Sequence, residues 1–65
     1  MTKEEALRMV EEIRNIEDID EVAHSYEDDL REAFIEFVAK RKDKLGEIAR
    51  IVLSTNDIRF SRWCA

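Results

Sequence analysis

The chain has 65 residues, of which 42% are charged and 45% hydrophobic, and its formal net charge is -5. A chain of this length forms one domain that buries only about 60% of its unfolded surface, which excludes a deep substrate cavity. With no proline and one glycine it lacks turn residues for a many-stranded sheet, and its one cysteine excludes an internal disulfide. No apolar run has the length of a signal peptide or membrane span. We therefore expect a single cytoplasmic helical domain over 1–65.

The charges are unevenly distributed along the chain. Up to Glu36 there are 13 acidic and 4 basic residues, so this part has a net charge of -9. From Phe37 onward there are 3 acidic and 7 basic residues, so the remainder has a net charge of +4. Acids near helix starts and bases near helix ends suit the helix dipole, so ordinary solvated helices account for much of this pattern. The alternative is a carboxylate surface for a basic partner, or a basic end for phosphates, and either would bind in a salt-sensitive way.

The first predicted element is a helix that begins at Lys3. Thr2 followed by Glu5 has the spacing of a capping box, in which each side chain bonds an amide of the other residue. Apolar residues at helical spacing then continue to Asn15, which predicts about three turns. This apolar stripe consists of Ala6, Leu7, Met9, Val10 and Ile13.

The next segment, 15–24, continues the apolar pattern at every third residue. Ile16, Ile19 and Val22 carry this repeat, and either Asn15 or Asp18 is able to cap a new helix start. We therefore expect a short second helix here that packs against the element that follows.

The central predicted element is a long helix over about 26–53. Ser25 with an acid three residues later has the pattern of another cap. Gly46 is unfavourable inside a helix and Asp43 is able to cap a fresh start, so a straight rod and a bend or break near 43–46 both remain open. The predicted fold is all-α, a small bundle of three to four helices built around this element. Its apolar face, the predicted core, consists of Tyr26, Leu30, Ala33, Phe34, Phe37, Val38, Leu45, Ile48, Ala49 and Val52.

The polar run 54–57 predicts the end of the long helix. A short terminal helix from Asp57 to Trp63 follows, with an extended tail as the alternative. We expect Trp63 to cover the helices, or otherwise to anchor a partner.

The sequence offers no catalytic constellation. His24 is the only histidine, with Glu21 and Asp28 within helical reach, and it is interpreted as a surface or packing residue rather than a metal ligand. Cys64 has no neighbouring histidine to activate it, although it could form an intermolecular disulfide. No catalytic residue, metal site or cofactor is predicted, which favours a non-enzymatic protein that acts by binding.

The three-residue apolar repeat, the segment 15–22, Phe37 placed eight residues before 45–48, and a tryptophan near the end form a longer pattern. This pattern resembles the Hha/YmoA family of small helical modulators. The resemblance implies four helices and binding to a nucleoid-structuring protein of the H-NS type. It also implies that an acid in the third helix contacts this partner, and Asp43 lies one residue from the matching place.

The C-terminal segment 45–63 suggests a different function. Its parts 45–49 and 61–63 are similar to the two helices of a helix-turn-helix DNA reader, and this resemblance implies that Arg59, Ser61 and Arg62 face the groove. The candidate nucleic-acid-binding residues of the basic half are Lys40, Arg41, Lys42, Lys44, Arg59 and Arg62.

A third possibility is an acidic inhibitor or adaptor of the kind that phages encode, in which carboxylates take the place of phosphates on a basic protein surface. The leading prediction is a small regulatory protein that binds another protein, and self-association is also expected because a thin core leaves an apolar patch to bury. The candidate partner-binding residues are Asp43, Glu17, Asp18, Asp20, Glu21, Asp28 and Asp29, with Glu27 beside them.

Overall fold

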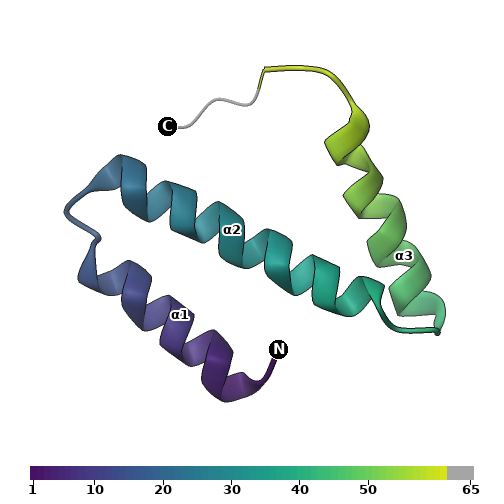
Figure 1. The fold of residues 1–65 in the computed structure, drawn as a ribbon, viewed down its shortest axis with the longest axis horizontal. Coiled ribbons are helices and arrows are strands. Elements are labelled where there is room, and N and C mark those ends of the chain that lie inside the picture. The colour runs from purple at the N-terminus through teal and green to yellow at the C-terminus, as the bar shows by residue number, and fades with distance from the viewer. Residues whose placement is uncertain (62–65) are drawn as a thin grey trace.

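A computed structural model of the protein describes residues 1–61. These residues form the helices α1 (Lys3–Asn15), α2 (Asp20–Ala39) and α3 (Lys44–Leu53), followed by the short 3-10 helix η1 (Ser54–Asp57). Figure 1 shows α1 and α3 on opposite sides of α2, with α3 folded back from the end of α2. No strand occurs in the described part of the chain, so the all-α prediction is confirmed.

The start of α1 agrees with the prediction. The Thr2 hydroxyl accepts a hydrogen bond from the Glu5 amide at 3.1 Å, and the Glu5 carboxylate accepts one from the Thr2 amide at 3.1 Å. This reciprocal capping box satisfies two backbone amides that have no partner within the helix. The hydrogen bond from the Thr2 amide to the Glu5 carboxylate lowers the pKa of Glu5. The helix begins at Lys3 and ends at Asn15, as expected.

The predicted short helix within 15–24 does not form as a separate element. Residues 16–19 are a turn, closed by the bond from the Ile19 amide to the Ile16 carbonyl, and α2 begins directly at Asp20. Ser25, the predicted cap, lies inside α2. Asp20 and Glu21 occupy the first turn of α2, where the positive end of the helix dipole favours acids.

The predicted long helix is two helices. α2 ends at Ala39, four residues form a turn, and α3 begins at Lys44 with Asp43 as its N-cap. A single rod over 26–53 is therefore wrong, and the alternative of a break is confirmed, although the turn at 40–43 overlaps the expected range 43–46 only at Asp43. In the C-terminal part, Ser54 and Thr55 donate their hydroxyls to the carbonyls of Ile51 and Val52, which terminates α3.

The predicted terminal helix is absent from the part of it that the structure describes. Residues 58–61 follow η1 without helical structure. Arg62, Trp63 and Cys64 lie outside the described residues, so the expected covering role of Trp63 also falls there. None of the helices in 1–61 combines the length and the apolar character that crossing a bilayer requires.

The three helices form a single flat layer. The Cα trace spans 38 × 33 × 9 Å, and Gly46 and Ala49 are the only buried residues between 1 and 61. Phe34, Leu45 and Ile48, which the sequence predicted to be core, are each about half exposed. Of the residues predicted to form the core only Ala49 is buried, and no second layer of the described chain covers the others. A domain normally buries the apolar sides of its helices between two layers.

Candidate interaction site

Large apolar side chains gather on one face of the layer. The small residues Gly46 and Ala49 are buried and form the inner side of α3, which faces α2. Figure 1 shows the directions in which the three helices run. Because the helices are right-handed, the stripe of Leu45, Ile48 and Val52, which lies beside the inner side of α3, is on the same face of the layer as the apolar stripes of α1 and α2. The six large side chains there are between 40% and 59% exposed. We call them the apolar face: Leu7, Val10, Phe34, Leu45, Ile48 and Val52.

A hollow deepens this face between α1 and α2. Its volume is about 410 Å³. Phe34 belongs both to the hollow and to the apolar face, and Arg31 is the only charged residue of the lining. The lining consists of Met1, Ala6, Leu30, Arg31, Phe34 and Ile35.

The opposite face has a smaller and more polar hollow of about 180 Å³. Leu30 lines both hollows, so they lie on the two sides of the contact between α1 and α2. Glu12 and Asp29 bring two carboxylates to the smaller hollow, beside Tyr26. Asp29 is the only predicted partner-binding residue found in either hollow.

Four of the predicted partner-binding acids cluster at one end of the molecule. Glu17 and Asp18 lie in the turn between α1 and α2, and Asp20 and Glu21 form the first turn of α2. We call these four residues the acidic end. Asp28 lies further along α2, with its Oδ2 3.5 Å from Nε2 of His24.

The predicted nucleic-acid-binding residues Lys40, Arg41, Lys42 and Lys44 cluster at the turn between α2 and α3, and we call them the basic end. Because α2 has 20 residues, about 30 Å separates the two ends. Asp43 lies at the basic end, so the structure does not bring it together with the other predicted acids.

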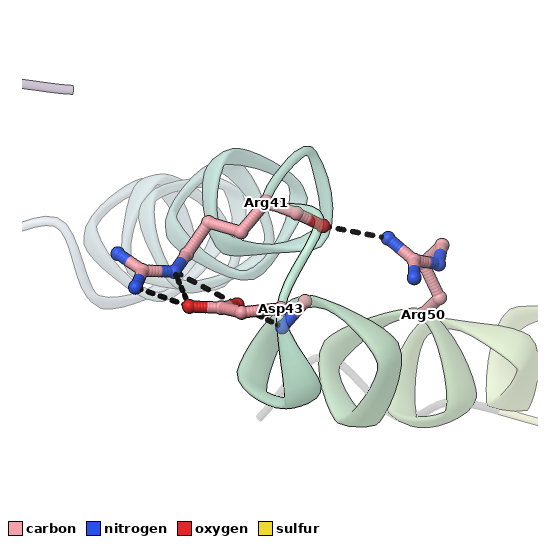
Figure 2. Close-up of polar contacts among 4 residues, drawn as sticks. Arg41, Asp43 and Arg50 are labelled. Atoms are coloured by element: carbon pink, nitrogen blue, oxygen red, sulfur yellow. Dashed lines mark hydrogen bonds and ion pairs between the residues drawn. The ribbon is translucent and has the colours of Figure 1, made fainter.

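Asp43 accepts hydrogen bonds from both sides of the turn at the basic end (Figure 2). Its Oδ1 accepts a hydrogen bond from the Gly46 amide at 3.1 Å and thereby caps α3. Nε of Arg41 donates to both carboxylate oxygens at 3.1 Å, and its Nη2 donates to Oδ2. The guanidinium of Arg41 and the Gly46 amide lower the pKa of Asp43 to about 2, and the carboxylate in turn raises the pKa of Arg41.

Arg50 makes the other polar contact across this turn. Its Nη1 donates to the carbonyls of Ala39 at 2.6 Å and Arg41 at 3.0 Å, and Figure 2 shows the second of these bonds. Both carbonyls lie at the end of α2, where a helix cannot bond them itself and where its dipole favours a cation. Sequence reasoning missed Arg50, because its acceptors lie 11 and 9 residues away on another helix.

These contacts change the interpretation of several predicted residues. Asp43 and Arg41, proposed for partner or nucleic-acid contact, have roles within the fold. Arg59 follows η1 in a segment that is not helical up to Ser61, so within the described residues α3 has no second helix with which to form a helix-turn-helix.

Among residues 1–61, no three histidine, cysteine or acidic side chains are arranged to hold a metal ion. Comparison of the chain with protein-family models, curated proteins and solved structures gave no match.

The Asp43 contacts predict a defined response to acid. Because the folded pKa of about 2 lies below the ordinary 3.8, the carboxylate stabilises the fold above pH 3.8, and this stabilisation is lost as the pH falls toward 2. We expect the unfolding free energy of Asp43→Asn to fall less steeply over this interval than that of the wild type. Urea titrations at a series of pH values, followed by circular dichroism, measure both slopes.

Arg41→Met should flatten the acid response in the same way, because it removes the largest cause of the lowered pKa. In the double variant the second substitution should add little, since both act on one ion pair. Equal slopes in the wild type and Asp43→Asn would contradict the assigned role of the pair.

Proposed function

We propose that this chain is a small non-enzymatic regulatory protein that acts by binding another protein, with the apolar face as its contact surface. The observation that supports this proposal is the single layer of helices, which leaves the apolar face uncovered. A surface formed by three helices and deepened by a hollow beside Phe34 suits a helical or globular protein surface.

The energetics favour a covered state of this face. Burying a large apolar side chain fully contributes about 1.5–3 kcal/mol relative to leaving it in water. Since the six side chains are about half exposed, covering them contributes roughly 5–9 kcal/mol before the entropy cost of association is subtracted. This is a large contribution for a chain with so few buried residues.

Within this class, the resemblance to the Hha/YmoA family would narrow the partner to a nucleoid-structuring protein. The described residues form three α-helices, where the resemblance implies four. Asp43, to which the resemblance assigns a partner contact, caps α3 and pairs with Arg41. We therefore base the proposed contact on the apolar face and not on Asp43.

The proposal is tested with two neighbouring positions of α3. Val52 belongs to the apolar face, whereas Ile51, which is 63% exposed, is turned by about 100° to the outer edge of the layer. Tagged wild type, Val52→Asp and Ile51→Asp are used to capture proteins from a lysate of the cells that carry the chain, and mass spectrometry quantifies them. We expect wild type and Ile51→Asp to retain a protein that Val52→Asp retains at least about tenfold less.

Circular dichroism should show the same helix content for both variants, so that a lost interaction is not confused with unfolding. If every captured protein, including a copy of the chain itself, is retained equally by Val52→Asp and Ile51→Asp, the apolar face is not the contact surface.

A further inference from the structure

We infer that the apolar face is covered by a second copy of this chain, packed antiparallel across a two-fold axis to give a dimer of two helical layers. The inference rests on the proposed function, because it names the protein that this surface binds. Two observations carry it: the excess surface of the chain and the opposite charges of its two ends.

The first observation is the exposed area. The chain exposes 5662 Å² at a mass of 7.7 kDa. A compact monomer of this mass exposes about 4,300 Å², so the single layer has roughly 1,300 Å² too much surface. Two copies packed as tightly as one globular protein of twice the mass would expose about 7,200 Å² and bury at most about 4,100 Å² between them. This upper bound leaves room for the interface of an obligate homodimer, which buries about 2,000–5,000 Å².

The second observation is charge. The acidic end has four carboxylates within 17–21 and no basic residue, whereas the basic end has four cations around the single acid Asp43. If two layers stacked in the same direction, like charges would meet at both ends. Antiparallel stacking places each acidic end over a basic end, and it also opposes the dipoles of the two α2 helices.

The same arrangement explains why the assembly closes at two copies. A two-fold axis that lies between the two layers and runs perpendicular to α2 makes the α2 helices antiparallel, and it keeps α1 of the second copy on the same side of the stack as α1 of the first, with α3 on the side of α3. Both apolar faces are used once, so no apolar face is left to add a third copy.

The mass in solution is the first test. Sedimentation equilibrium of the full chain with Cys64→Ser, which excludes adventitious disulfides, is run from about 5 to about 500 µM. We expect a mass of twice 7.7 kDa for the wild type and for Ile51→Asp, and a dissociation constant raised at least about tenfold for Val52→Asp. A wild type that stays at 7.7 kDa throughout overturns the inference, as does a dimer that Val52→Asp leaves unchanged.

The orientation is tested without altering the interface. A zero-length carbodiimide reagent joins a carboxylate to an amine in direct contact, and about 30 Å of helix prevents the acidic end from reaching Lys42 of its own chain. We expect links from Glu17, Asp18, Asp20 or Glu21 to Lys40, Lys42 or Lys44, and in mixtures of ¹⁴N and ¹⁵N chains these links should join chains of different label.

The dimer and the proposed protein binding can be contradicted separately. If the wild type is a monomer but a different protein is captured in a Val52-dependent manner, the second copy is excluded and the proposed function remains. If a dimer forms without links between acidic and basic ends, the antiparallel arrangement is overturned.

Discussion

Replacing Gly46 by alanine is expected to destabilise the protein by about 1–3 kcal/mol. In an ordinary helix interior the same change stabilises by about 1 kcal/mol, so the expected sign is reversed here. A Cβ on Gly46 would lie 2.1 Å from the carbonyl oxygen of Arg41 and 2.7 Å from its carbonyl carbon. Both are backbone atoms, so relief requires α3 to move away from the end of α2. Gly46 has no positive φ, so its close approach and not its backbone conformation demands glycine.

Urea unfolding of both proteins at one chain concentration, followed by circular dichroism, measures the difference. Ser25→Ala is a suitable control, because Ser25 is exposed within α2 and alanine there should be neutral or stabilising by about 0.5 kcal/mol. A Gly46→Ala protein that is more stable than the wild type would show that α3 does not approach Arg41 this closely in solution.

Replacing Arg50 by methionine is expected to destabilise the protein by about 1–2 kcal/mol. The substitution keeps much of the side-chain bulk but removes the donor to the carbonyls of Ala39 and Arg41, and with it the cation at the negative end of the α2 dipole. Water replaces the lost donor because the site is exposed, which keeps the effect moderate. Arg50→Lys should be intermediate, since one ammonium group lacks the planar fork of the guanidinium.

Thermal and urea unfolding compare Arg50→Met with Arg8→Met. Arg8 pairs only with Glu12, one turn away on the exposed side of α1 at 3.9 Å, and its loss should change stability by less than about 0.5 kcal/mol. Equal effects of the two substitutions would mean that Arg50 does not clamp the turn.

The parts of the fold that were predicted correctly are encoded by short-range chemistry. Thr2 with Glu5 and the cap at Asp43 depend on bonds across three residues, so the sequence pattern contains both partners. The same spacing at Ser25 misled the prediction, because a serine followed by an acid three residues later also fits the middle of a helix.

The missed features depend on contacts between helices. Arg50 belongs to α3 but donates to the carbonyls of Ala39 and Arg41 at the end of α2. No sequence pattern within one helix predicts such a contact between two helices. Phe34 was assigned to the core because helical periodicity shows which residues share a side. Periodicity does not show whether the same chain supplies the surface that covers this side, and here the described residues do not.

One consequence of the flat arrangement concerns how the molecule opens. Among the described elements, α1 contacts α2 and α3 contacts α2, but α1 and α3 do not touch (Figure 1). Each outer helix can therefore detach without disturbing the other, and α1 lacks any clamp comparable to the one at the turn between α2 and α3. Amide protons of α1 should thus exchange with solvent through a local opening, while the hairpin of α2 and α3 opens as a separate cooperative unit.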